Sequence, residues 1–437
     1  MNLLNRTIVE RPEYFSSAYL PVTNDRVDDL LTNLHLRSLA TFDKLPLAEK
    51  HRLIDLKLQH LITSSHELPL WKDLSLPSIS TTKEVKDLPI TNKDTYRAQP
   101  IERRTNLRLA ERFGVETRTS GSTGEPLEFY IDGRLRVRQR ALLARTMRRQ
   151  RFYIQQLVNL WPSHNPNPLF GKVFYSAKTK DILYDKRHEL YTHINRPGTV
   201  LQSFSSYLNW LTEFADKDGV TLRPSVVVTS GETLSNEAAS SLSRVFACPV
   251  QNYLGSREFS IMAGRCSEGR YHLEAQDLFM EVLNEEGNDC APGEVGKLTF
   301  TGLNSHLAPF IRYQNGDVGF TFSDNCSCGD QRVSFSFIGR SADIRPISLP
   351  DGNTILPYRF TGIFNKQYEK IRQYQVKHIA KGRYELLLVV TNAFTSVDEE
   401  AIQTEFSNLV QSNDVKILRV ASIPSSGPKI LPYLKTY

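Results

Sequence analysis

Short apolar segments suited to β-strands alternate with helical segments through the middle of the chain, and this alternation constrains the fold more than any other feature. Strand-like runs include residues 225–229 (SVVVT) and 297–301 (KLTFT), and a helical segment over residues 235–246 starts behind Ser235, a good helix-capping residue. Strands and helices in alternation build a sheet packed between helices. We therefore predict an α/β fold from about residue 113 to residue 340.

The two ends of the chain predict further units. Residues 1–110 are expected to be helical, because apolar side chains recur there at helical spacing. The last part repeats the alternation on a smaller scale, with strands at 384–390 and 416–420 around a helix at 397–410 that starts behind Ser396.

A chain of 437 residues, 40% of them apolar, exceeds the size at which a single core stops growing. We predict a large N-terminal α/β domain over residues 1–340 and a small, mobile C-terminal α+β lid domain over residues 341–437. Residues 340–352 are rich in proline, glycine and charge, and are the expected hinge.

Composition narrows the classes of protein to which the chain can belong. The net charge of +6 is too small for a typical nucleic-acid binder, although it favours small anionic substrates such as nucleotides. No apolar run approaches the length of a membrane span, and the first residues lack the layout of a signal peptide. Five irregularly spaced cysteines argue against a disulfide framework. We therefore expect a cytoplasmic protein.

Residues 119–126 (TSGSTGEP) predict a phosphate-binding loop between two strand-like segments, 113–117 and 127–131. Glycines let the backbone N–H groups approach an anion, and the hydroxyl groups add donors. It is not a Walker loop, because Glu125 and Pro126 stand where that motif has Lys and Ser or Thr. An ordinary turn or linker is the alternative.

An arginine-rich segment is also expected to form one helix. Such runs most often face solvent, and we predict a solvated face here. The alternatives are binding of a cofactor's phosphate tail, of an acidic partner or of nucleic acid. The arginines are Arg134, Arg136, Arg138, Arg140, Arg145, Arg148, Arg149 and Arg151.

Three more segments carry polar residues at predicted turns. Residues 230–233 (SGET) directly follow a strand, where open α/β sheets bind ligands. Residues 253–258 (YLGSRE) place the Glu258 carboxylate beside a glycine turn, and residues 312–317 (RYQNGD) place an aspartate where it could bind ribose hydroxyls. Each segment by itself is equally typical of a structural turn.

In order and approximate separation, these segments and the loop at 119–126 resemble the adenylate-forming, or acyl-activating, superfamily. The likeness is closest to the phenylacetate-CoA ligase branch, which includes adenylate-forming proteins associated with capsular polysaccharide synthesis, and covers roughly residues 45–437. The resemblance implies that a carboxylic acid attacks ATP to give an acyl-adenylate and pyrophosphate, and that a nucleophile then displaces AMP. Backbone donors, Mg²⁺ and a lysine would stabilise the charge that builds on the α-phosphoryl group.

The resemblance also implies roles for individual residues. Glu258 would coordinate Mg²⁺, Asp317 and Arg340 would bind the ribose, and Lys429 would contact the α-phosphate and the reacting carboxylate. The adenine would lie against Ser230, Gly231 and Glu232. The β- and γ-phosphates would be held by the loop, in which Thr123 is also a catalytic candidate; its residues are Ser120, Gly121, Ser122, Thr123 and Gly124.

The chain departs from the family pattern at three places. Many relatives have Tyr-Gly-x-Thr-Glu, whereas here Leu254 replaces the aromatic residue and Arg257 replaces the threonine, and Arg257 can still bind a phosphate. A proline precedes Lys429, so that Lys435 is the alternative catalytic lysine. The first acidic hinge position is an alanine, which leaves the hinge role to Asp343.

Cysteine and histidine spacing predicts a structural zinc site. Cys266 and His272 form a Cys-x5-His pair, and Cys326 and Cys328 form a Cys-x-Cys pair among polar neighbours. Four such ligands suit tetrahedral Zn²⁺. Packing of the thiols in the core is the alternative.

The preferred function is therefore ATP-dependent activation of a small carboxylic acid, with CoA as the acyl acceptor. An amine, a hydroxyl group or a carrier-protein thiol is the alternative acceptor, because residues 347–357 differ from the Arg-Gly stretch of phenylacetate-CoA ligases. A zinc-containing polyanion-binding module is the non-enzymatic alternative. A homodimer is compatible with the enzyme, and neither nucleic acid nor a membrane is expected as a partner. The sequence does not specify the acid.

Overall fold

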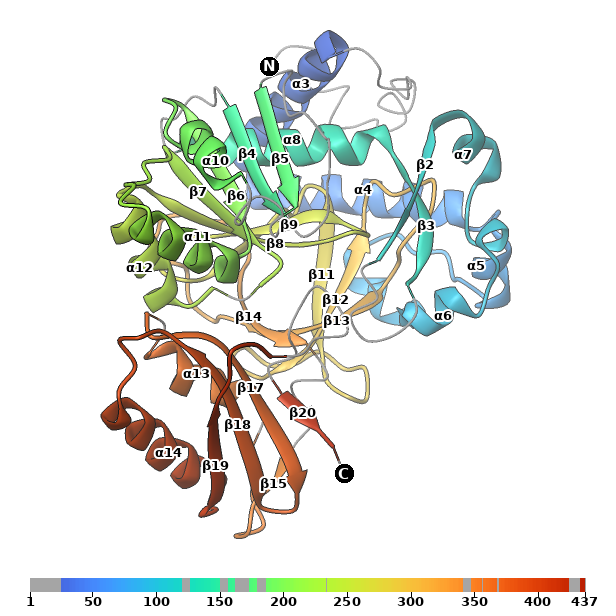
Figure 1. Ribbon diagram of the computed structural model, residues 1–437. Coiled ribbons are helices and arrows are strands. Elements are labelled where there is room, and N and C mark those ends of the chain that lie inside the picture. The colour runs from blue at the N-terminus through green and yellow to red at the C-terminus, as the bar shows by residue number, and fades with distance from the viewer. Residues whose placement is uncertain are drawn as a thin grey trace.

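The computed structural model describes residues 25–119, 126–149, 156–161, 173–178, 186–232, 234–340, 347–355, 357–367, 369–423 and 433–436. A large domain is built on a twelve-stranded sheet, and a smaller C-terminal domain with a four-stranded sheet lies below it in Figure 1. This confirms the predicted α/β class with a smaller second domain. Within the described residues, no helix is long and apolar enough to cross a membrane.

The chain begins with helices, as predicted. In α4, apolar side chains spaced by three or four residues point into the core, and Leu58 and Leu61 are fully buried. The elements are α3 (Asp25–Asp43), α4 (Leu47–Ser65), α5 (Pro69–Asp73), η1 (Thr82–Asp87), β1 (Thr91–Asn92), α6 (Lys93–Arg97), η2 (Ile101–Arg103) and α7 (Leu107–Phe113).

The large sheet has a parallel half and an antiparallel half, in the order β11-β12-β13-β14-β10-β9-β8-β7-β6-β4-β5. Strands β4 to β8 run parallel, and α10, α11 and α12 cover one face of them (Figure 1). Strands β8 to β14 pair antiparallel, and β1 adds to β13 in parallel. The sheet is therefore mixed, and its two halves meet at β8.

The remaining elements of the large domain follow the predicted alternation. Ser235 caps α12 by accepting a hydrogen bond from Ala238 N, as predicted. The elements are β2 (Gly114–Arg118), β3 (Glu128–Asp132), α8 (Gly133–Arg149), β4 (Gln156–Trp161), β5 (Val173–Lys178), α10 (Arg187–Ile194), β6 (Thr199–Ser203), α11 (Ser205–Lys217), β7 (Val226–Ser230), α12 (Asn236–Phe246), β8 (Val250–Ser256), β9 (Ser260–Arg265), β10 (Tyr271–Leu273), β11 (Leu278–Leu283), β12 (Gly296–Gly302), β13 (Tyr313–Thr321) and β14 (Ser334–Arg340).

The small domain packs α13 and α14 on the sheet β19-β18-β17-β20. Its helix α14 starts one residue earlier than predicted, because Thr395 rather than Ser396 is the N-cap and forms a capping box with Asp398. The elements are β15 (Ile347–Ser348), β16 (Thr354–Ile355), η4 (Pro357–Arg359), α13 (Phe360–Asn365), β17 (Ile371–Ala380), β18 (Arg383–Val390), α14 (Ser396–Val410), β19 (Asp414–Arg419) and β20 (Tyr433–Lys435).

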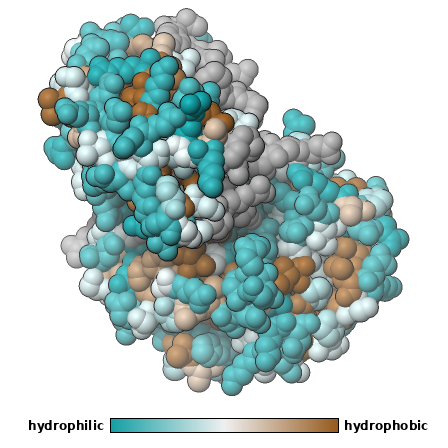
Figure 2. All heavy atoms as spheres, turned by 90° about the horizontal axis from the view of Figure 1, so that it is seen from below, coloured by the Kyte–Doolittle hydropathy of each residue, from teal (hydrophilic) through white to brown (hydrophobic). Residues whose placement is uncertain are grey.

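Polar contacts join the two domains on the helix-covered side of the large sheet. Arg372 Nη1 lies 2.6 Å from Glu213 Oε2 of α11, and Glu369 accepts hydrogen bonds from Ser241 and Arg244 of α12. Seen from below, the surface is largely hydrophilic and its apolar side chains are scattered in small groups (Figure 2).

The arginine-rich helix α8 is not the solvated face that we predicted. Arg138, Arg140 and Arg145 are buried, each with at most 8% of its surface exposed. Arg138 lies 3.0 Å from Asp277, and Arg145 pairs with Glu274. The prediction was wrong for these three residues because carboxylates from the turn between β10 and β11 meet the helix.

Candidate nucleotide site and metal centre

Glu258 lies at the tip of the β8–β9 hairpin, where the two halves of the large sheet meet. A Cβ atom at Gly255 would lie 2.7 Å from Ser260 O, so this tight hairpin requires glycine at that position. The Glu258 side chain is buried, and its Oε1 accepts a hydrogen bond of 3.1 Å from the Tyr313 hydroxyl. Burial and the charge of Glu258 both raise the pKa of Tyr313, which keeps the hydroxyl protonated as a donor.

Asp317 and Arg340 face each other across β13 and β14. The Arg340 guanidinium donates hydrogen bonds to Asp317 Oδ1 and to the carbonyl oxygen of Asn315. The Asn315 side chain donates to Asp317 Oδ2 at 2.7 Å and accepts from Asp317 N at 2.9 Å. These bonds fix the orientation of a buried carboxylate on the same strand as Tyr313.

Lys93 lies beside these carboxylates. Strand β1 pairs with β13, and Asn92 caps the following helix α6, so that Lys93 leaves the sheet close to the site. The pKa of Lys93 is lowered by burial and by the neighbouring Arg340 and Arg97, and the negative charges of Glu258 and Asp317 only partly oppose this. The site thus combines two buried carboxylates with a partly buried lysine and Arg340.

The end of β7 has a different arrangement. Ser230 ends the strand, and Gly231 has a φ of 81°, which favours glycine. The Glu232 carboxylate accepts hydrogen bonds from the Ser205 hydroxyl and from the hydroxyl and N–H of Ser206, at 2.7 to 3.0 Å. The side chain of Glu232 therefore holds the N-terminus of α11.

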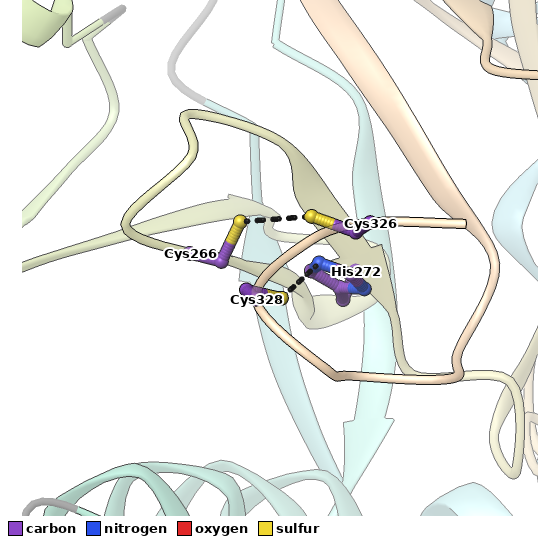
Figure 3. A group of neighbouring side chains, drawn as sticks. All are labelled: Cys266, His272, Cys326 and Cys328. Carbon is purple, nitrogen blue, oxygen red and sulfur yellow. Dashed lines mark hydrogen bonds between the residues drawn. The ribbon is translucent and has the colours of Figure 1, made fainter. Parts of the chain in front are cut away.

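Four potential metal ligands converge beside strands β9, β10 and β14 of the antiparallel half, and Figure 3 shows their side chains pointing toward one another. Cys266 follows β9, His272 lies in β10, and Cys326 and Cys328 lie in the loop between β13 and β14. All four ligand atoms lie within 4.8 Å of one another.

Two distances in this cluster match a metal tetrahedron. The Sγ atoms of Cys266 and Cys326 are 3.7 Å apart, and Cys328 Sγ lies 3.3 Å from His272 Nε2. Zn–S bonds of about 2.3 Å at tetrahedral angles separate two sulfur atoms by about 3.8 Å. A disulfide needs an S–S distance of about 2.05 Å. The cluster therefore has the spacing of a metal site, and its three cysteines are free thiols.

A local turn presents the Cys-x-Cys pair. Gly329 N donates to Cys326 O, and Asp330 N lies 3.5 Å from Cys328 Sγ, as in a loop whose backbone N–H groups support thiolates. His272 is almost fully buried, and its Nδ1 is 3.4 Å from the Arg332 carbonyl oxygen. That contact leaves Nε2 to face the sulfur atoms.

Comparison with known proteins adds to this geometry. No family model matches the sequence. A segment of 119 residues is 28% identical to phenylacetate-coenzyme A ligase of Thermus thermophilus and covers 26% of each protein, so that the chain matches about a quarter of this curated relative. The structure of 2-hydroxyisobutyryl-CoA ligase in the postadenylation state with 2-HIB-AMP matches with a TM-score of 0.72 and 18% identity, over 90% of each chain.

This chain has the adenylate-forming fold. The same ligase with 2-HIB-AMP and CoA in its thioesterification state matches with a TM-score of 0.55 and 18% identity, over 91% of each chain. Coverage is nearly equal for the two states, and the TM-score is higher for the postadenylation state.

On the adenylate-forming fold, the structure brings together part of the residue set that the sequence indicated. Glu258, Asp317 and Arg340 lie at one site, and Arg257 is exposed on the same hairpin as Glu258. Lys435 lies in β20 and pairs with His378 in the small domain.

Other predicted residues lie outside the described part of the chain: Ser120, Gly121, Ser122, Thr123, Gly124, Asp343 and Lys429. The base of the 119–126 loop is described. Thr119 N donates to Leu127 O at 3.0 Å, and Leu127 N donates to Thr119 Oγ1 at 2.9 Å, which closes the β2–β3 hairpin beneath the loop.

Sequence reasoning missed Lys93. The local sequence around it marks only a helix start, through Asn92 and Thr95 as a capping box. No pattern links this lysine to Glu258, because the pairing of β1 with β13 joins segments that are distant along the chain.

Proposed function

We propose that this protein activates a small carboxylic acid with ATP, releasing pyrophosphate to form an acyl-adenylate, and then transfers the acyl group to CoA. The observation that carries the proposal is the grouping of Glu258 with Asp317 and Arg340, since Tyr313 on the strand of Asp317 donates to Glu258, with Lys93 near them. The adenylate-forming fold and the segment similar to phenylacetate-coenzyme A ligase support it.

In the first step, a carboxylate oxygen attacks the α-phosphorus, and the bond from that phosphorus to the bridging oxygen breaks as pyrophosphate leaves. In the second, the CoA thiolate attacks the acyl carbon, and AMP leaves with the former carboxylate oxygen. AMP is a far better leaving group than oxide, which is why the acid is adenylated first. The protein's task is to orient the acid and to stabilise charge on the phosphoryl group.

The buried residues have the chemistry for these tasks. Glu258 is an oxygen ligand of the kind that Mg²⁺ prefers, and Tyr313 fixes its orientation. Mg²⁺ would neutralise charge on the phosphates. Asp317 would accept hydrogen bonds from ribose hydroxyls while Arg340 and Asn315 hold it in place.

Two groups of residues complete the proposed nucleotide site. The loop from Ser120 to Gly124 would bind the β- and γ-phosphates, with help from Arg257. The backbone of Ser230 and Gly231 would line the adenine, since the Glu232 side chain holds α11.

We retain Lys429 as the lysine that contacts the reacting carboxylate, with Lys435 as its alternative, and add Lys93 as a second cation. Lys93 belongs to the large domain, whereas Lys429 would enter with the small domain. We place the domain boundary at residue 340 and the hinge at Asp343. Two lysines on different domains would let the large domain keep one cation at the site when the lid moves.

CoA is the acceptor that we favour, because the relatives named above are CoA ligases. An amine, a hydroxyl group or a carrier-protein thiol is the alternative. A polyanion-binding module is a weaker alternative, because the described arginines Arg138, Arg140 and Arg145 of α8 are buried. We also propose a cytoplasmic location, because the cysteine cluster needs reduced thiols. A homodimer is a further part of the proposal.

We further propose that Cys266, His272, Cys326 and Cys328 bind structural Zn²⁺. The ligand set fits, since three thiolates and one imidazole at these separations suit a tetrahedral ion. Four protein ligands leave no open position for a reacting water. The ion would join the β9–β10 hairpin to the loop before β14.

ATP–pyrophosphate exchange over a panel of acids tests the main proposal, and dependence on added CoA tests the acceptor. The substitution Glu258→Gln should lower exchange by about 100-fold or more, because it weakens the ligand that would hold Mg²⁺ against the phosphates. Glu286→Gln, at an exposed turn, is the matched control and should retain activity. If the wild type binds no ATP and exchanges with no acid, the proposal is wrong.

A further inference from the structure

A pocket opens beside Glu258, within the large domain. Part of its wall is apolar and includes Phe129, Leu135 and Phe310. The rest is unusually polar for such a buried space: besides Glu258, its charged members are Lys57, Arg138 and Asp277. Pockets for small molecules are mostly apolar and use a few polar groups to set specificity, so these three residues carry information about the ligand.

The charged members contact one another. Arg138 Nε lies 3.0 Å from Asp277 Oδ2, and Lys57 Nζ lies 4.0 Å from Asp277 Oδ1. Asp277 is fully buried, and the other two residues each have 6% of their surface exposed. Helices α4 and α8 therefore contribute two cations to one carboxylate.

The hydrogen bonds of Lys57 leave part of its capacity unused. Within the described residues, its ammonium group donates one hydrogen bond, of 2.6 Å, to the Gln276 carbonyl oxygen. An ammonium group carries three donors. Burial lowers the pKa of Lys57 while Asp277 opposes this, so a further acceptor or anion beside the nitrogen would favour the charged form.

The neighbouring Gln276 offers the complementary group. Its Nε2 donates to Ser38 Oγ at 2.7 Å, which turns the amide, and its buried Oε1 has no hydrogen-bond partner among the described residues. A buried acceptor without a donor is costly, and a ligand that supplies one removes that cost. Lys57 and Gln276 both line the pocket.

We infer, on the basis of the proposed function, that the acid substrate carries a second oxygen group, a hydroxyl or a carboxylate, which binds to Lys57 in this pocket. A hydroxyl would accept from Lys57 Nζ and donate to Gln276 Oε1. A carboxylate would instead pair with the Lys57 ammonium group, whose donors are only partly used. Either group distinguishes the substrate from unsubstituted fatty or aromatic acids.

ATP–pyrophosphate exchange with matched acids tests this inference. Straight-chain acids and phenylacetic acids would each be supplied unsubstituted, with a hydroxyl group and with a second carboxyl group. Wild-type enzyme should show a kcat/KM at least about tenfold higher for an oxygen-bearing member, because its buried polar groups stay unpaired with the unsubstituted acid.

The substitution Lys57→Met should abolish this preference while exchange with the unsubstituted acid persists. Lys50→Met on the same helix is the control, since Lys50 donates to Asp43 O away from the pocket. Gln276→Leu distinguishes a hydroxyl group from a carboxylate on the substrate. It should lower kcat/KM for the hydroxy acid and leave kcat/KM for the dicarboxylic acid unchanged. It also provides a second test if Lys57→Met does not fold.

The outcomes separate this inference from the proposed function. If the wild type exchanges well with unsubstituted acids and gains nothing from the oxygen group, the inference is wrong and the function stands. An equal loss for all acids in Lys57→Met, with an unchanged preference, would assign the residue to structural support and overturn the inference. No exchange with any acid, together with no ATP binding, would overturn both.

Discussion

The ion pairs inside the large domain differ from those that join it to the small domain. Inside, Asp277 pairs with Arg138, and their side chains are 0% and 7% exposed. Between the domains, Arg244 and Glu369 are 69% and 60% exposed. The same kind of interaction therefore occurs in two environments, one dry and one wet.

The environment decides what each pair contributes. An exposed ion pair contributes little to the free energy of unfolding, because water already solvates both charges and salt screens them. A buried pair is not strongly stabilising in net terms either, yet the loss of one partner leaves an uncompensated charge in the core. The large domain is thus held in one arrangement, whereas the contacts between domains can be exchanged at small cost, as a moving lid would need.

Asp277→Asn should have the largest effect. It leaves Lys57 and Arg138 buried without their carboxylate, and we expect a loss of about 3–5 kcal/mol in the free energy of unfolding. Urea unfolding of the large-domain transition measures it. Asp324→Asn is the control, because Asp324 pairs with Arg270 at the surface. Equal effects of the two substitutions would remove the distinction between dry and wet pairs.

The effect of Asp277→Asn should also depend on pH. Burial raises the pKa of Asp277, but Arg138, His35 and Lys57 outweigh it and hold the pKa below the usual range. The extra stability of the wild type over Asp277→Asn should therefore be complete above about pH 4, the pKa of an aspartate in the unfolded chain. It should be lost as pH falls from there through the lower pKa of Asp277 in the folded protein.

Cys328→Ser should have the next largest effect, because the metal is expected to hold the β9–β10 hairpin and the loop before β14 together. Substitution of a residue that only supports a metal ligand lowers metal affinity by about 10- to 100-fold. We therefore expect the loss of a ligand itself to lower the free energy of unfolding by about 3 kcal/mol or more. Elemental analysis and thermal unfolding with and without a chelator measure it. Cys290→Ala is the control, and unchanged metal content in Cys328→Ser would contradict the site.

Arg372→Ala should have the smallest effect. Its pair with Glu213 is partly exposed, and such pairs contribute about 0.2–1 kcal/mol. We expect little change in unfolding but a shift toward an open arrangement of the domains, seen by small-angle X-ray scattering and enhanced by salt. The control is Arg383→Ala, which removes a pair with Asp414 inside the small domain. Salt-insensitive scattering of the wild type would argue against a role for these contacts.

Much of the fold follows from local patterns. The strand near residues 225–229 and the cap at Ser235 were both predicted, because strand periodicity and capping depend on neighbouring residues. The error of one residue at the start of α14 is local too, since Thr395 and Ser396 are both good caps and the position of Asp398 selects between them.

The candidate sites were predictable to different degrees. Cys-x5-His and Cys-x-Cys spacing indicates ligands directly, because few other roles require that pattern, and the structure brings the four residues together. Lys93 carried no such signal. The buried arginines of α8 were misread, because a helix rich in arginine has the same sequence pattern whether it faces water or carboxylates.

The sequence alone was enough to predict the alternation of strands and helices, a second domain and the residues of the cysteine–histidine cluster, since these depend on side-chain chemistry and short-range spacing. The tertiary structure was needed to show that β1 brings Lys93 near Glu258 and that Asp277 and Glu274 meet α8. The reason is physical: pairing between strands and burial of charge depend on which distant segments meet, and no single segment encodes its partner.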